Sequence, residues 1–114
     1  MPADAQPETS FELIEDTWFT LRDGYDDALQ LAQTEADRSD LLHQRDGARD
    51  AYYMALGKLF DEQDEFIKKT KKELKEATAY MKRELAELQN IAAVLNAISS
   101  AVKLAAAVAG MAIP

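Results

Sequence analysis

One histidine and no cysteine limit the catalytic chemistry that this chain could perform. A serine triad or a histidine general base would depend on His43, the only imidazole in the sequence. No serine stands in a glycine-rich elbow or beside an oxyanion-hole motif. Cysteine nucleophiles, thiolate metal ligands and disulfides are excluded because the sequence contains no cysteine. We therefore predict no catalytic residue and expect His43 to be an exposed side chain near a loop.

The carboxylates are numerous, but their spacing does not match a metal site. Four acids crowd residues 61–65, yet they lack the alternating ligands and the central glycine of a calcium loop. A helical di-iron centre needs two Glu-x-x-His elements, which a single histidine cannot supply. The sequence therefore predicts a solvated acidic surface, no bound metal and no cofactor.

The one cluster of basic residues lies between residues 68 and 75. Lys68, Lys72 and Lys75 share a helical face, and they form a candidate patch for anions such as lipid headgroups. The alternative is contact within the chain. In an antiparallel hairpin that turns near residue 40, the acids around Glu8 and Glu12 would lie opposite residues 65–72 and neutralise these lysines.

Charge divides unevenly along the chain, whose net charge is −8. Residues 1–65 contain 17 acids and 5 bases, and residues 66–114 contain 4 acids and 8 bases. The acidic part would repel phosphates, so we expect no nucleic-acid partner. Parts of opposite charge could attract a second copy head to tail, or each other within one subunit.

Helices must carry all of these side chains, because no proline interrupts residues 8–113. Ser10 offers an N-cap and Glu12 an acid in the first turn, after which apolar residues recur at spacings of three and four. This pattern predicts a helix over about 10–38, preceded by a disordered or extended segment at 1–9. Its seam residues are Phe11, Ile14, Trp18, Leu21 and Tyr25.

The apolar pattern fades after Ala32, and turn residues follow. Ser39-Asp40 offers a second N-cap, whereas Asp46-Gly47 has the stronger turn chemistry. Both positions stay open at this point. We therefore place a connection within residues 38–48.

An uninterrupted heptad line dominates the second part of the sequence. Eight apolar residues follow one another at intervals of seven from Phe60 to Ala109, and most of the residues one position later are polar. Such phase-locking predicts a single helix over about 49–112. The seam residues of its first half are Phe60, Ile67, Leu74, Met81 and Leu88.

The C-terminal part of this predicted helix is apolar on most of its circumference, so something must cover it. The alternatives are another copy, a different protein, a membrane, or a third helix made by an unannounced break. Residues 104–114 form a run without a polar side chain that is too short to span a bilayer, and Lys103 opposes insertion. The predicted interaction surface is Ile91, Val94, Leu95, Ile98, Val102, Ala105, Val108 and Ala109.

Together these patterns predict an all-α fold: one domain over 10–114, built as a helical hairpin that forms a coiled-coil-like bundle on oligomerisation. We expect a non-enzymatic assembly or protein-interaction module whose partner is another copy of the chain or another helical protein. The alternative is a membrane-active, pore-forming or translocator-like helical protein that uses residues 91–114. The start of the chain has no secretory signal pattern, so we expect it to be cytoplasmic or secreted without a cleavable signal.

Overall fold

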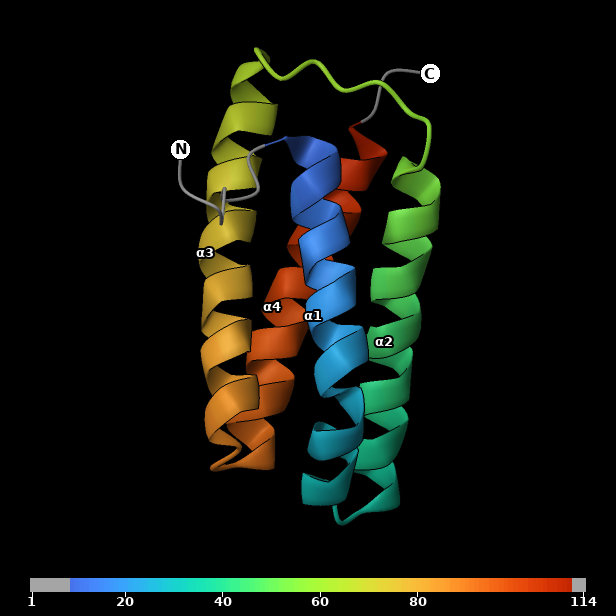
Figure 1. Cartoon of the computed structure of the whole chain (residues 1–114), viewed down its shortest axis with the longest axis vertical. Helices are drawn as coiled ribbons and strands as arrows, with labels where there is room; N and C mark the ends of the chain where they lie inside the picture. The colour runs from blue at the N-terminus through green and yellow to red at the C-terminus, as the bar shows by residue number, and fades with distance from the viewer. Residues whose placement is uncertain (1–8, 112–114) are drawn as a thin grey trace.

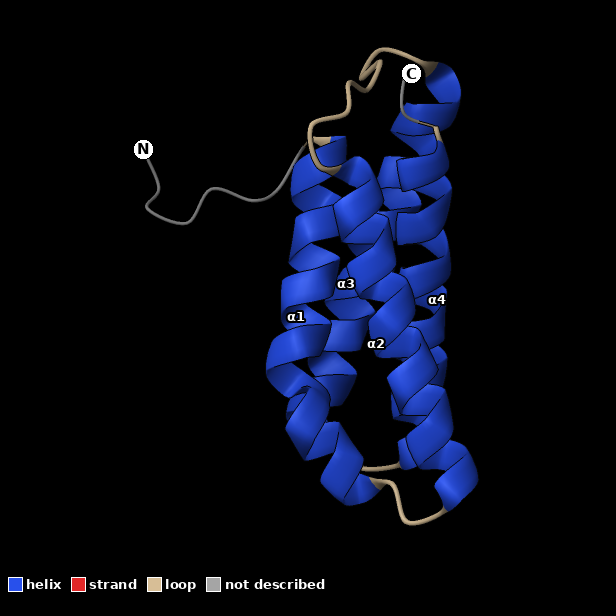
Figure 2. Ribbon diagram, turned by 90° about the vertical axis from the view of Figure 1, so that its right-hand side faces the viewer, coloured by secondary structure: helices blue, strands red, loops and turns tan. Residues whose placement is uncertain are grey.

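Four helices make up the part of the chain that the structure describes. The computed structural model describes residues 9–111, which contain α1 (Ser10–Leu31), α2 (Glu35–Ala55), α3 (Glu65–Glu87) and α4 (Ile91–Gly110). The helices alternate in direction, with a long connection at one end of the bundle and two short ones at the other (Figure 1) (Figure 2). The all-α prediction is confirmed. Of the segment 1–9 that we expected to be disordered or extended, residues 1–8 lie outside the described residues, and Thr9 has an extended backbone.

The predicted connection at 38–48 is wrong, because this range lies inside α2. The chain turns earlier, at residues 32–34, where the side-chain oxygen of Thr34 accepts a hydrogen bond of 3.1 Å from the amide of Asp37. Threonine followed by acids is a favourable helix start. Gly47 serves packing and not a turn: a Cβ there would lie 3.2 Å from Val102 Cγ1, so glycine lets α2 and α4 approach closely.

The predicted long helix at 49–112 is also wrong, because two connections interrupt it. Residues 56–64 cross the end of the bundle from α2 to α3, and Gly57 adopts a left-handed φ of 72° there. Residues 88–90 form the second turn. In this turn Leu88 has a left-handed backbone conformation (φ 48°). The side-chain oxygen of Asn90 accepts hydrogen bonds from the backbone amides of Ala92 and Ala93 in the first turn of α4. The two-helix hairpin is therefore replaced by four helices.

The heptad line nevertheless points into the core on both sides of the second turn. Ile67, Leu74 and Met81 are buried in α3, and Val102 and Ala109 are buried in α4. The two helices are antiparallel neighbours, and the three-residue turn between them happens to preserve the spacing of seven. A constant phase therefore did not require a continuous helix.

α4 buries more residues than any other described helix, eight against six in α1. Both α4 and α1 pack against the three other helices. α3 packs against α1 and α4, and α2 packs against α1 and α4, so α2 and α3 stand at opposite corners (Figure 1). This extensive burial agrees with the apolar composition of α4, whereas α1 keeps an exposed charged face. Its alanines at 97, 101, 105 and 109 are all buried and allow this close approach.

Candidate functional site

The predicted interaction surface on α4 lies mostly inside the core of a single chain. Ile91 and Leu95 are partly buried and pack against that core. The other six residues are buried: Val94, Ile98, Val102, Ala105, Val108 and Ala109. Of the alternatives for covering this face, the structure shows a break in the predicted long helix. The other three helices of the same chain then pack against α4.

The predicted seam residues all line the interior of the bundle. The buried ones are Ile14, Leu21, Ile67, Leu74 and Met81. The partly buried ones, which pack against the same core, are Phe11, Trp18, Tyr25, Phe60 and Leu88.

The candidate anion patch of Lys68, Lys72 and Lys75 is exposed on α3. No ion pair is recorded for these three lysines within residues 9–111. Two other lysines make the contacts to acids: Lys71 with Glu62 (2.9 Å) and Lys82 with Asp16 (2.8 Å).

The expected antiparallel alignment of the first helix with these lysines is wrong, because α1 and α3 run parallel. Asp16 pairs with Lys82, while Thr17 and Thr78 share a buried hydrogen bond of 2.9 Å one turn away. The start of α1 therefore lies beside the start of α3. The N-cap of α1 is Thr9, one residue before the predicted Ser10, and Thr9 forms a capping box with Glu12.

This shift frees Ser10 for a contact with the α2–α3 connection. Glu62 on that connection accepts hydrogen bonds from the Ser10 amide (3.0 Å), the Ser10 hydroxyl (2.7 Å) and the Lys71 ammonium (2.9 Å). Burial by itself would raise the pKa of Glu62. The hydrogen bonds from Lys71 and Ser10 and the charge of Lys71 outweigh burial, and the pKa lies below its usual value. The Glu62 carboxylate thus fastens the connection to α1 and α3.

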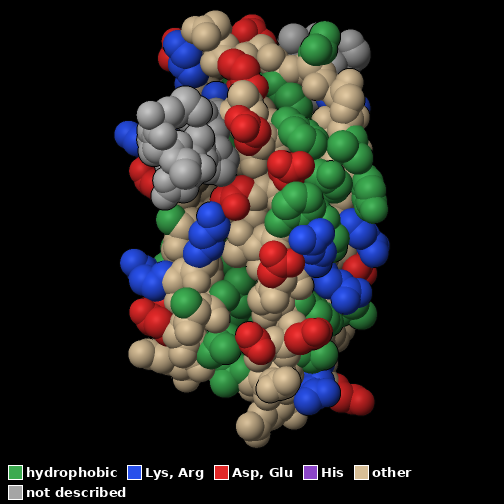
Figure 3. All heavy atoms as spheres, viewed as in Figure 1, with side chains coloured by type: hydrophobic (Ala, Val, Ile, Leu, Met, Phe, Trp, Pro, Cys, Tyr) green, Lys and Arg blue, Asp and Glu red, His purple; other side chains and the backbone are tan. Residues whose placement is uncertain are grey.

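The same end of the bundle carries most of the exposed large apolar side chains. They are defined here as the apolar end patch, with exposed fractions of 61%, 49%, 45%, 71% and 73% for Tyr53, Met54, Leu56, Leu59 and Phe66. Leu42, near the other end, is the one further exposed large apolar residue within the described range. Apolar side chains also gather over the upper half of α2 and the adjoining edge of α1 (Figure 3).

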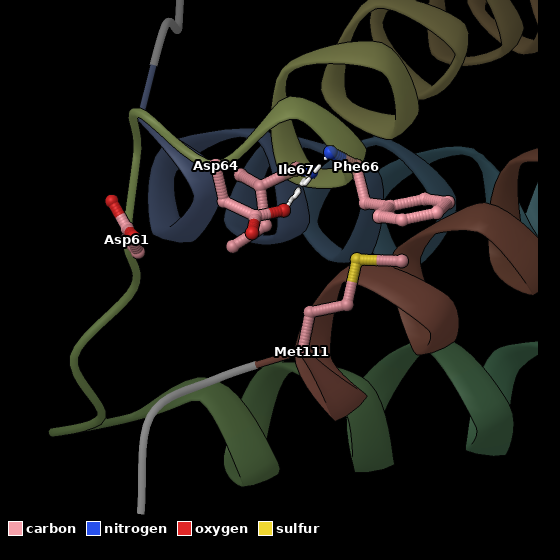
Figure 4. Close-up of a pocket in the computed structure, with 5 residues that line it drawn as sticks. All are labelled: Asp61, Asp64, Phe66, Ile67 and Met111. Carbon is pink, nitrogen blue, oxygen red and sulfur yellow. Dashed lines mark hydrogen bonds between the residues drawn. The ribbon is translucent and has the colours of Figure 1, made fainter.

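A depression of about 430 Å³ opens beside the apolar end patch. Phe66, from the start of α3, and Met111, from the end of α4, point toward one another across it (Figure 4). Asp61, Asp64 and Ile67 complete the lining. The Asp64 carboxylate accepts hydrogen bonds from the backbone amides of Phe66 and Ile67, at 2.9 and 3.1 Å, and thereby caps α3. Its primary role is structural.

Other features of the described range bear on the remaining predictions. His43 is exposed on α2, within the helix and not near a loop. No group of three or more His, Asp or Glu side chains in residues 9–111 is placed to hold a metal ion. α4, with 20 residues and a mean hydropathy of 1.8, is the one described helix long and apolar enough to cross a membrane, a criterion that core helices also meet.

Sequence reasoning missed the apolar end patch because it placed these residues in a continuous helix. In such a helix Leu56 and Leu59 would continue the apolar face, and Phe66 would flank the seam. Two local signals marked the connection: Gly57, which takes the left-handed conformation, and Asp64, which stands as an N-cap before the apolar residues of α3.

Comparison with known proteins adds no further identification. No protein-family model matches the chain, and searches of curated proteins and of solved structures give no match. The functional argument therefore rests on the residues and their geometry.

Proposed function

We propose that this chain is a non-enzymatic helical interaction module, which associates with a second copy of itself or with another helical protein. The observation that carries the proposal is the apolar end patch. Five large apolar side chains are between 45% and 73% exposed at one end of the bundle. Exposed apolar surface of this extent is a mark of interaction sites.

The composition of the exposed surface supports the same proposal. Four of the five arginines lie on α1 and α2, and all eight lysines lie outside these two helices. Two of these arginines lie over aromatic rings, Arg22 over Phe19 and Arg45 over Tyr25, at 4.4 and 4.5 Å from the ring centroids. Arg83 on α3 likewise lies over Tyr80, at 5.1 Å. Arginine and aromatic residues are enriched at protein interfaces, whereas lysine and glutamate are depleted.

The folded bundle limits how α4 could take part in binding a partner. Its apolar face already contacts three helices of its own chain. A partner could replace those contacts only by opening the bundle, for example through exchange of α4 between two copies. Contact through the exposed end requires no such opening and is therefore the simpler mode.

Mass measurement by light scattering at increasing concentration, with and without anionic liposomes, tests the proposal. We expect a mass above the 12.7 kDa of one chain, which rises with concentration in the absence of lipid. A protein that stays monomeric and floats with liposomes would contradict it.

That outcome would favour the second candidate function, a membrane-active helical protein. The specific observation behind it is the length and hydropathy of α4. Insertion would require α4 to leave the core, so membrane binding should be accompanied by the loss of the α4 contacts with α1–α3. Protection of α4 amides from hydrogen exchange, compared with and without liposomes, distinguishes insertion from surface adsorption.

A further inference from the structure

The turn between α3 and α4 has an unusual composition for the end of a helix. Leu88, Gln89 and Asn90 form it, and none of them is glycine or proline. Leu88 has a left-handed backbone conformation, with φ 48° and ψ 41°, and is the one residue other than glycine in residues 9–111 with a positive φ. This conformation is unfavourable for leucine, and glycine usually occupies it at helix ends. The turn is therefore strained, although leucine and glutamine are both good helix formers.

The other two connections of the described chain lack this strain. The connection at 56–64 has a glycine, Gly57, at its left-handed position (φ 72°). The turn at 32–34 has extended backbone at its first and last residues. Among the three connections, therefore, only 88–90 would lose backbone strain by becoming helical.

The apolar and polar residues on either side of this turn share one register. From Ile67 to Ala109 every seventh residue is buried or partly buried, and from Lys68 to Lys103 every seventh residue is exposed. Both lines pass through the turn. Two antiparallel helices joined by a turn have independent registers, so the closed bundle seen in the structure does not require this agreement. A single helix through the turn would require it.

α4 contacts the other three helices through apolar side chains. None of the ion pairs and side-chain hydrogen bonds recorded within residues 9–111 joins α4 to another helix. The recorded side-chain hydrogen bonds between helices join α1 and α3: Asp16 with Lys82, and Thr17 with Thr78. Apolar contacts can be broken and re-formed with an identical helix without leaving a buried polar group unpaired. Only α4 of a second copy reproduces all of these contacts.

We propose that residues 88–90 are a hinge through which two copies of this chain exchange α4. In the exchanged dimer α3, the hinge and α4 form one helix over 65–110, and α4 of each copy completes the core of the other. The two long helices pack antiparallel along the unbroken line of apolar residues. The connection at 56–64 keeps its closed conformation, so this helix is shorter than one over 49–112. The inference rests on the proposed interaction function, and it names the partner and the mode of contact.

The balance between the two forms depends on the hinge and on concentration, because the contacts within the core are the same in both. Asn90 stabilises the closed form, since its side chain accepts hydrogen bonds from the amides of Ala92 and Ala93 at 2.8 and 3.3 Å. The exchanged form makes the hinge helical and removes the strain at Leu88, and short strained connections favour exchange. Exchange also requires the bundle to open. We therefore expect dimers to form slowly and at high protein concentration.

Size-exclusion chromatography with light scattering tests the hinge in the full chain. Concentrated protein is incubated a few degrees below its melting temperature, and monomer and dimer are then separated. Leu88→Gly should lower the dimerisation constant at least about tenfold relative to Leu88→Ala, because glycine suits the left-handed turn and disfavours the helix in both chains. Both variants lose the leucine side chain, so their difference isolates the backbone.

A second matched pair of variants removes one helix cap each. Asn90→Ala removes the cap of α4, which exists only in the closed form, so the dimerisation constant should rise at least about tenfold. Thr34→Ala removes the cap of α2, which both forms share. It should destabilise the chain and leave the dimerisation constant unchanged.

The distance between two spin labels within one chain shows whether α4 has been exchanged. The chain has no cysteine, so Lys75→Cys/Lys103→Cys provides two specific attachment sites, both exposed. In the closed form these positions lie at the same level on neighbouring helices, whose axes are about 8–10 Å apart. In the exchanged dimer they lie on one helix, roughly 40 Å apart. Dilution of labelled chains into excess unlabelled protein ensures that the measured distance belongs to one chain.

The outcomes separate the hinge from the interaction function. A dimer that keeps the short distance within each chain would reject exchange and leave the interaction function standing. Equal dimerisation of Leu88→Gly and Leu88→Ala, or of Asn90→Ala and Thr34→Ala, would reject the hinge. A parent protein that stays monomeric at millimolar concentration would also reject exchange, and flotation with liposomes would then contradict the interaction function itself.

Discussion

α3 and α4 carry one continuous line of apolar residues, yet they are very different helices. α3 has a single buried face and an outer face of lysines and glutamates, whereas α4 has one charged residue in 20. α3 packs against two helices, and α4 packs against all three. The extent of burial differs in the same sense, with eight buried residues in α4 and five in α3. The number of neighbours alone does not set composition, because α1 also packs against three helices and carries many charges. The compositions of α3 and α4 agree with how much of each helix is buried, and a high apolar content does not by itself indicate an external partner.

The largest expected effect comes from placing a charge in the enclosed face of α4. Ile98 is fully buried, so Ile98→Asp introduces an uncompensated buried charge that costs about 4 kcal/mol or more. Chains of this size are stable by only about 5–15 kcal/mol, so we expect the cooperative thermal transition to be lost or strongly lowered. Ala106→Asp, on an exposed position of the same helix, is the control and should melt close to the parent. Equal melting of the two variants would mean that α4 is not enclosed.

A smaller loss is expected from truncating the buried face of α3. Leu74 is fully buried, and Leu74→Ala should lower the free energy of unfolding by about 2–5 kcal/mol in urea titration. Leu88, on the same heptad line but partly buried at the turn, should lose less on Leu88→Ala. Similar losses at both positions would favour one continuous helix over the turn.

The connection that leads into α3 should be sensitive to acid. Glu62 has a lowered pKa in the folded chain, so its contribution is present above its unfolded pKa of about 4.5 and is lost as the pH falls through the lower folded value. Glu62→Gln should destabilise the protein by about 1–2 kcal/mol at neutral pH, because the charged hydrogen bonds with Lys71 and Ser10 are weakened. The difference from the parent should shrink below pH 4.5. A constant difference from pH 7 to pH 3 would contradict the role of the carboxylate.

The turn between α3 and α4 allows a test for which we expect only a small change in stability. Leu88 adopts a left-handed φ of 48°, which is unfavourable for a leucine by about 1 kcal/mol and neutral for glycine. Leu88→Gly also removes a partly buried side chain, so we expect a net change within about 1 kcal/mol. Leu88→Ala removes the side chain and keeps the backbone strain, so it should be less stable than Leu88→Gly. The reverse order would place Leu88 within a helix.

The smallest effect on stability is expected at the outer face of α3. Lys68→Gln/Lys72→Gln/Lys75→Gln removes three exposed charges that have no recorded ion pair in residues 9–111, so the melting temperature should hardly change. The same variant tests the candidate anion patch through cosedimentation with anionic vesicles at low and physiological salt. Binding by the parent that the variant loses would support the patch, and equal behaviour of the two would contradict it.

Local patterns in the sequence were sufficient for the helical class and for the residues that face the core. The proline-free interior and the apolar periodicity required helices, and the predicted seam residues from Phe11 to Leu88 all contact the interior. Such patterns act through neighbours three to seven residues apart, so they can be read without the fold. The capping signal at the start of α1 was likewise visible, displaced by one residue to Thr9.

Only the tertiary structure decided where the helices end and what covers α4. A three-residue turn at 88–90 keeps the heptad phase, so periodicity cannot distinguish two antiparallel helices from one long helix. Asp46-Gly47 has the sequence of a turn, but Gly47 lies inside a helix against Val102. Glycine is needed there because a side chain at position 47 would crowd Val102, a residue distant in sequence. The cover of α4 depends on three helices whose positions are set by long-range packing. The sequence required that its apolar face be buried, and the fold determined that the chain buries most of that face itself.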